Sequence, residues 1–109
     1  MILKKDDANV VRRPNFKGGE LYLDADIFSD ESGKIIRGFL PPKGSIGLHT
    51  HDDSYEVIYI IKGNAKFVYE DKVEYASSGD IHYCPYGKSH TFINDSEDII
   101  EFIGIVPNK

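Results

Sequence analysis

Three histidines and one glutamate, His49, His51, Glu56 and His90, have a spacing that suits metal ligation. Side chains at positions i and i+2 of a strand point to the same face, so the segment His49-Thr50-His51 can bring two imidazoles side by side. Glu56 follows after a polar loop, and a return of the chain can place its carboxylate beside them. Three neutral imidazoles and a carboxylate suit one divalent first-row transition metal, with water at open positions. Taken alone, the His-x-His pair is more often a pair of ordinary surface histidines beside a loop.

Other polar residues could take part in chemistry, but the sequence assigns none of them a catalytic role. His82 lines a metal cavity only if the register of its hairpin points it inward, and a slip of one residue reverses that direction. Glu101 is the only charge in the run 99–103, so it is either a buried general base or a side chain that faces solvent. Cys84 lies in an apolar strand-like run, where a lone cysteine is usually a small buried hydrophobe.

The elements that must position these residues are short strands. Turn-forming clusters of Gly, Pro, Asn, Asp and Ser recur every few residues, and no segment keeps the apolar period of 3.6 that marks a helix. Between the turns lie segments rich in Val, Ile, Phe and Tyr, at about 20–28, 34–40, 46–51, 56–62, 65–70, 72–76, 80–84, 89–94 and 98–106. About nine strands with short connections predict an all-β sandwich or barrel. The run 57–61 is apolar at every position, which predicts a strand covered on both faces.

Length and composition predict one domain at 17–109, preceded by an N-terminal arm or strand at 1–16. The chain has 109 residues, and its net charge of −5 argues against a nucleic-acid or anionic-membrane partner. Its single cysteine excludes an intramolecular disulfide and fits a reducing compartment. The segment Met1–Asp7 turns charged after three residues, unlike a signal peptide, and no apolar run approaches the ~20 residues of a membrane span. We therefore expect a cytoplasmic protein.

Two motifs in this sequence resemble those of the cupin superfamily. The first, written G-(x)5-H-x-H-(x)4-E-(x)6-G, matches His49, His51, Glu56 and Gly63. The second, written G-(x)5-P-x-G-(x)2-H-(x)3-N, matches Gly79, Pro85, Gly87, His90 and Asn94. The resemblance is to a small single-domain cupin of the cupin 2 type, and it spans residues 43 to 94. It implies a cupin jelly-roll β-barrel, also called a double-stranded β-helix, with a metal ion inside it held by His49, His51, Glu56 and His90.

One position departs from the first motif. The glycine that opens the motif would fall on Lys43, and Gly44 stands next to it. We therefore expect a shifted turn within the segment 41–44, which affects the geometry of this loop rather than the ligands.

The resemblance leaves two classes of function open, because cupins with these ligands include many enzymes as well as binding proteins. The first hypothesis is a metal-dependent dioxygenase, isomerase or lyase that acts on a small polar substrate, such as a sugar derivative or an organic acid. Its cofactor would be one divalent transition metal, Mn, Fe, Ni, Zn or Co. The alternative is a non-catalytic module that binds or senses a small molecule at the same metal site. A base inside the cavity would favour the enzyme, and a purely apolar cavity would favour binding.

The resemblance also implies a homodimer, since small cupins often pair. The segments Met1-Ile2-Leu3 and Leu21-Tyr22-Leu23 could supply a strand that covers an open sheet edge of the partner, because exposed edges favour such pairing.

Overall fold

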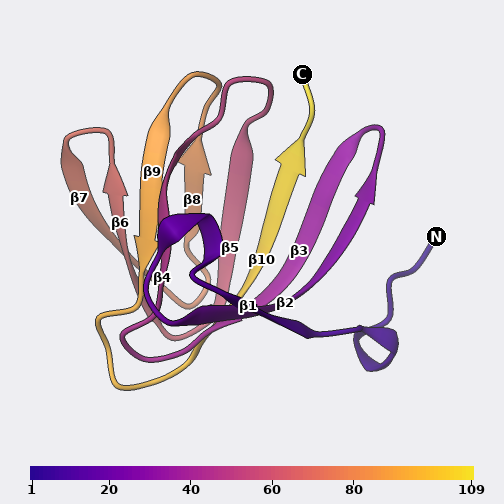
Figure 1. Cartoon of the computed structure of the whole chain (residues 1–109), viewed down its shortest axis with the longest axis horizontal. Coiled ribbons are helices and arrows are strands. Elements are labelled where there is room, and N and C mark those ends of the chain that lie inside the picture. Colours follow the sequence, from indigo (N-terminus) through magenta and orange to yellow (C-terminus); the bar gives the residue numbers. More distant parts are fainter.

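The computed structural model describes all residues from Met1 to Lys109 and contains ten β-strands and two short 3-10 helices (Figure 1). The strands are β1 (Val11–Pro14), β2 (Tyr22–Asp30), β3 (Gly33–Leu40), β4 (Ser45–Thr50), β5 (Glu56–Lys62), β6 (Asn64–Tyr69), β7 (Lys72–Ser77), β8 (Ile81–Cys84), β9 (Ser89–Ile93) and β10 (Ile100–Pro107). The 3-10 helices are η1 (Lys5–Asp7) and η2 (Phe16–Gly18). Neither helix has the length and hydrophobicity that crossing a membrane requires.

The strands form two antiparallel sheets. The larger sheet has the order β1-β2-β3-β10-β5-β8, and the smaller one has the order β4-β9-β6-β7. In Figure 1 the strands β6, β7 and β9 lie at the left, and β5, β10, β3 and β2 fan out to the right. Consecutive strands such as β4 and β5 belong to different sheets, so the chain crosses between the sheets and closes them into a jelly-roll barrel. The predicted all-β fold is confirmed.

Large apolar side chains fill the space between the two sheets. The rings of Phe67 and Phe92 lie 4.6 Å apart between centroids, and those of Phe92 and Phe102 lie 4.9 Å apart. Each of these rings is almost fully buried, as are Ile58 and Ile60 of β5. The core therefore joins β6 and β9 of the smaller sheet to β5 and β10 of the larger one.

The run 57–61 is covered on only one face by the chain itself. Neighbouring residues of a strand point to opposite faces, and Ile58 and Ile60 take the inner face of β5. Tyr59 remains 44% exposed and Ile61 38% exposed on the outer face. The prediction that this strand is covered on both faces is wrong within one chain.

The segment before β2 forms part of the barrel wall. Residues 11–14 form β1, which pairs with β2 at the edge of the larger sheet. The next residues form η2, which lies against β4 and carries Phe16 onto the hydrophobic core. A Cβ atom at Gly47 of β4 would overlap the carbonyl oxygen of Lys17, so glycine permits this close approach of the two backbones.

The turn that opens the first motif is not shifted. The amide of Gly44 donates to the carbonyl oxygen of Pro41 at 2.9 Å, and Lys43 has a φ of 66°. A positive φ at the third residue of such a turn is normally supplied by glycine. Here Lys43 itself takes the left-handed conformation, so the turn occupies the expected place and the expected shift is wrong.

Candidate metal centre

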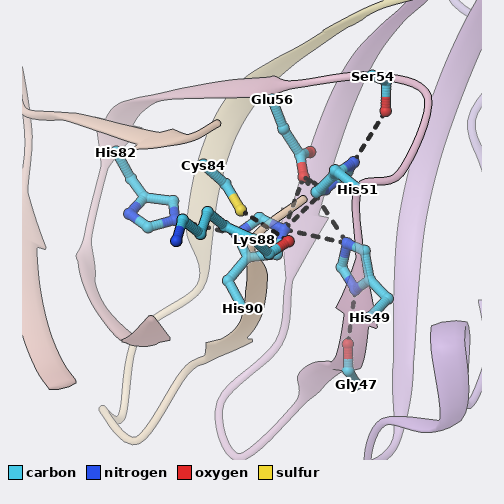
Figure 2. A network of polar contacts seen from close by, with 9 residues as sticks. All are labelled: Gly47, His49, His51, Ser54, Glu56, His82, Cys84, Lys88 and His90. Carbon is cyan, nitrogen blue, oxygen red and sulfur yellow. Dashed lines mark hydrogen bonds and ion pairs between the residues drawn. The ribbon is translucent and has the colours of Figure 1, made fainter. Parts of the chain in front are cut away.

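The four side chains His49, His51, Glu56 and His90 meet at one end of the barrel (Figure 2). His49 of β4 lies directly opposite His90 of β9 in the smaller sheet. His51 follows the end of β4, and Glu56 is the first residue of β5 in the larger sheet. The cluster therefore bridges the two sheets, and the chain between His51 and Glu56 is the loop that crosses from one sheet to the other.

The distances between the donor atoms suit a shared metal ion. Nε2 of His90 lies 3.0 Å from Nε2 of His49, 3.0 Å from Nε2 of His51 and 2.9 Å from Oε1 of Glu56. Oε1 of Glu56 lies 3.0 Å from Nε2 of His51 and 3.8 Å from Nε2 of His49. Ligand atoms at about 2.1 Å from a metal ion are about 3.0 Å apart at right angles and about 3.4 Å apart in a tetrahedron. Most of these separations fit right-angled ligands, which leaves room for further ligands around the ion.

Hydrogen bonds on the far side of each ring orient its Nε2 atom. Nδ1 of His49 lies 2.7 Å from the carbonyl oxygen of Gly47, which can only accept, so the proton is on Nδ1 and Nε2 carries the lone pair. Nδ1 of His51 lies 3.0 Å from the hydroxyl of Ser54, and Nδ1 of His90 lies 3.0 Å from Nε2 of His82. Such partners commonly hold histidines that bind metal. The donor set and its supports therefore fit a divalent transition metal.

Glu56 gives the cluster its negative charge. Its side chain is 8% exposed, and burial by itself would raise its pKa. The three nearby imidazoles outweigh burial and hold the pKa of Glu56 well below its ordinary value. At neutral pH the group is therefore a carboxylate, which is the form that binds a cation.

His82 lies behind the cluster rather than in the cavity. Its Nε2 atom faces Nδ1 of His90, and its ring stacks on Phe67 with 3.9 Å between centroids. Burial, followed by the nearby charge of His90, lowers the pKa of His82 to about 4. His82 is thus a neutral neighbour of a candidate ligand and not a ligand itself.

Glu101 and Cys84 do not supply a reactive group to the cavity. Glu101 pairs with Phe39 on one side and Lys62 on the other, and it lines a different surface hollow. Cys84 is buried opposite Glu56, and its Sγ lies 3.5 Å from the carbonyl oxygen of Lys88. Burial, with a smaller contribution from the charge of Glu56, raises the pKa of the Cys84 thiol to about 11, so it stays protonated.

A cavity of about 330 Å³ opens beside the four side chains. Its apolar wall consists of Phe16, Ile27, Ile36, Ile46, Ile58, Phe92, Phe102 and Val106. Charged groups outside the cluster also line it, namely Lys17, Lys34, Asp52 and Asp53. Sequence reasoning missed Phe16, Lys17 and Lys34, because they belong to no motif and reach the site only through the docking of η2 and the pairing of β3.

Comparisons with known proteins agree with this architecture. The model of the Cupin domain family, Cupin_2, matches residues 38–106. The oxalate-binding protein of Thermotoga maritima is 26% identical, over 97% of this chain and 93% of that protein. A crystal structure from Thermotoga maritima, described as a predicted oxalate decarboxylase, superposes with a TM-score of 0.93 at 24% identity over the whole of both chains. The polyketide cyclase RemF of Streptomyces resistomycificus superposes with a TM-score of 0.76 at 21% identity, over all of this chain and 80% of that one.

Removing one donor from the cluster should abolish tight metal binding. We expect the wild-type protein to take up one divalent ion at neutral pH and His51→Ala and His90→Ala each to fail to hold it, because each removes a nitrogen that lies 3.0 Å from other donors. Thr50→Ala is the matched control, since the Thr50 hydroxyl contacts Ser89 at 2.6 Å rather than the cluster. Metal content by mass spectrometry after gel filtration measures this, and retention of one tight ion in all variants would contradict the assignment.

The stability of the metal-free protein should fall as the pH decreases from about 6.5 towards 4. His82 has a folded-state pKa of about 4, below its ordinary value of 6.5, so in this range unfolding takes up a proton. One such proton contributes a slope of up to about 1.4 kcal/mol per pH unit. Urea unfolding of the wild type and of His82→Gln at several pH values measures the slope. The variant should show a shallower dependence, and equal slopes would show that His82 is not the responsible group.

Proposed function

The chain belongs to the cupin domain family, and on that basis we propose that it binds one divalent transition metal through His49, His51, Glu56 and His90. The observation that carries this proposal is the convergence of four donor atoms from two sheets, with three imidazoles oriented by partners on their far sides. Mn, Fe, Ni, Zn and Co all accept imidazole and carboxylate ligands. When bound, the ion supplies a positive charge and a Lewis acid at the inner end of the cavity.

The ligand that we propose is a small organic acid. Lys17 and Lys34 line the cavity together with Asp52 and Asp53, and each lysine can pair with a carboxylate of the ligand. The wall is otherwise largely isoleucine and phenylalanine, which offers few partners to the many hydroxyls of a sugar derivative. The similarity to an oxalate-binding protein supports the same class of ligand. An acid whose carboxylate faces the metal and whose body contacts the apolar wall fits this cavity best.

The residues of this chain would bind and enclose such an acid. The lysines would hold the negative charge at the entrance, and the apolar wall would exclude water from the inner end. Asp52, Asp53 and Ser54 line the cavity, and their loop is held in place by the amide of Lys109, which donates to the carbonyl oxygen of Asp53 at 2.7 Å. Capture of an organic acid at the metal is therefore the function that this geometry supports best.

A lyase is the second candidate function, and one observation favours it. Asp52 and Asp53 line the cavity on the loop between His51 and Glu56, so carboxylates other than the proposed ligands border the bound acid. In a decarboxylation, one of them could hold the proton that replaces the lost carboxyl group.

Oxalate should bind the Mn(II)-loaded protein and should bind more weakly when a cavity lysine is neutralised. Lys34→Gln should raise the Kd by about five-fold, as expected for a charge contact of about 1 kcal/mol. Lys72→Gln is the control, because Lys72 is exposed on β7 and does not line the cavity. Calorimetry with oxalate, succinate and glucose measures the affinities. Binding of glucose in preference to both acids would contradict the ligand class, and release of CO2 from oxalate would favour the lyase.

We also propose that the protein forms a homodimer through the outer face of its larger sheet. Apolar residues of neighbouring strands lie opposite one another there, in the pairs Tyr59–Ile81, Val57–Tyr83 and Ile35–Ile105. Ile81 is 64% exposed, Tyr83 52% and Ile105 42%. A contiguous apolar face of this kind marks an interaction surface, and a second copy would cover it with a face of the same composition.

Only part of the N-terminal region is available to contact a second copy in the proposed dimer. Met1 and Ile2 are 99% and 82% exposed, so they remain free to contact a partner. The segment 21–23 does not, since Tyr22 and Leu23 pair with β1 of the same chain and Leu23 is fully buried in its own core. The expectation that this segment covers a partner's edge is therefore wrong.

Light scattering at micromolar concentration should return twice the chain mass of 12.3 kDa. Ile105→Lys should return the monomer mass, because it places a charge in the middle of the outer face. Val73→Lys is the control, since Val73 is 55% exposed on β7 of the other sheet. A wild-type mass of one chain would contradict the dimer, as would dissociation by the control but not by Ile105→Lys.

A further inference from the structure

A second buried histidine stands directly behind one of the proposed metal ligands. Nε2 of His82 lies 3.0 Å from Nδ1 of His90, on the side of the His90 ring away from the donor cluster (Figure 2). The His82 side chain is 3% exposed, and its ring stacks almost parallel on Phe67, with 12° between the planes. A phenylalanine or leucine would satisfy that apolar position without the cost of burying a polar ring. The contact of His82 with Nδ1 of His90 therefore explains why this buried position carries a histidine.

The other nitrogen of His82 faces a carboxylate. Nδ1 of His82 lies 3.6 Å from Oε1 of Glu74, whose side chain is 50% exposed on β7. The three side chains Glu74, His82 and His90 thus form a series that begins at the surface and ends at the candidate metal centre. Glu74 lies on β7, His82 on β8 and His90 on β9. The series therefore connects the smaller sheet, which contains β7 and β9, with the larger sheet, which contains β8.

The protons in this series can be placed consistently. A metal bound at Nε2 of His90 leaves the proton of that ring on Nδ1, which then donates to Nε2 of His82. His82 therefore carries its own proton on Nδ1, and this N–H points to the Glu74 carboxylate. In this arrangement the N–H of His90 meets an acceptor and the N–H of His82 faces the Glu74 carboxylate at 3.6 Å, whereas the opposite tautomer of His82 would place two N–H groups against each other.

The series also makes His90 different from the other two histidines. The Nδ1 atoms of His49 and His51 face a backbone carbonyl and a serine hydroxyl, respectively. Only His90 is backed by an imidazole that in turn faces a carboxylate. Partners of this kind fix the orientation of a metal-binding ring and raise its basicity.

We propose that His82, held by Glu74, is a positioning residue that fixes the tautomer and the orientation of His90 for metal binding. This inference rests on the proposed metal function of His90. It adds two residues outside the cavity, and neither of them belongs to the motifs that identify the ligands.

Pulsed electron paramagnetic resonance of the Cu(II)-loaded protein tests the proposal. The method detects the remote Nδ1 nitrogen of each coordinated imidazole, and the signal depends on the hydrogen bond that this nitrogen makes. His82→Phe keeps a ring to stack on Phe67 but removes the acceptor, so we expect it to shift the signal of one remote nitrogen. The Cu(II) affinity should fall by about 10- to 100-fold, the usual cost of losing such a partner.

Two further variants separate positioning from mere packing. His82→Gln replaces the ring by a side chain whose carbonyl can accept from His90, so it should restore most of the affinity and the remote-nitrogen signal. Glu74→Gln should give a smaller shift of the same signal, because the contact with His82 is retained without the charge. Ser54→Ala is the comparison for the His51 ring, since it should alter the signal of a different nitrogen.

The possible failures are distinguishable. Unchanged affinity and unchanged nitrogen signals in a folded His82→Phe protein would overturn this inference and leave the proposed ligands intact. If His82→Phe does not fold, an unchanged nitrogen signal in Glu74→Gln, or a Cu(II) affinity of His82→Gln as low as that of His90→Ala, overturns it. A wild-type protein that takes up no Cu(II) would overturn the proposed metal function together with this inference.

Discussion

The rest of the structure depends on the burial of one carboxylate among three imidazoles. Oε1 of Glu56 and the three Nε2 atoms lie close together beside a cavity whose wall is partly apolar. Removing a carboxylate from water is costly unless hydrogen bonds or a cation replace the lost hydration. The imidazoles replace part of it, and a metal ion at the common point would replace more. The site is thus stable only where strands from both sheets are held at the correct separation.

The core and the turns maintain that separation. Phe67, Phe92 and Phe102 bind the two sheets together, and the turn at Lys43 adopts a left-handed conformation that lets β4 begin in register. Gly47 has two roles, since its lack of a side chain lets η2 approach β4 and its carbonyl oxygen accepts the Nδ1 proton of His49. The N-terminal segment therefore contributes to the same site as the motifs, although it precedes them by more than one strand.

The three histidines of the candidate metal centre are oriented by three different kinds of partner. His49 is fixed by the main chain, His51 by a serine in the crossing loop, and His90 by a second histidine. The loop that carries Ser54 also carries Asp52 and Asp53 at the cavity entrance, so the orientation of His51 and the arrangement of the entrance share one element. A ligand that moves this loop would act on one donor, whereas the main chain and the strand pairing hold the other two.

The sequence by itself determined the fold class and the four residues that come together. Dense turn signals and segments rich in Val, Ile, Phe and Tyr predict strands, because strand propensity is local. The resemblance of two motifs to those of cupins singles out His49, His51, Glu56 and His90. Only the tertiary structure decided that Glu101 lies outside the cavity, that His82 stands behind His90, and that Lys17 and Lys34 line the cavity. It also decided that Tyr59 and Ile61 remain uncovered within one chain. These outcomes depend on the register between strands and on contacts between segments far apart in the sequence, and no local pattern of residues encodes them.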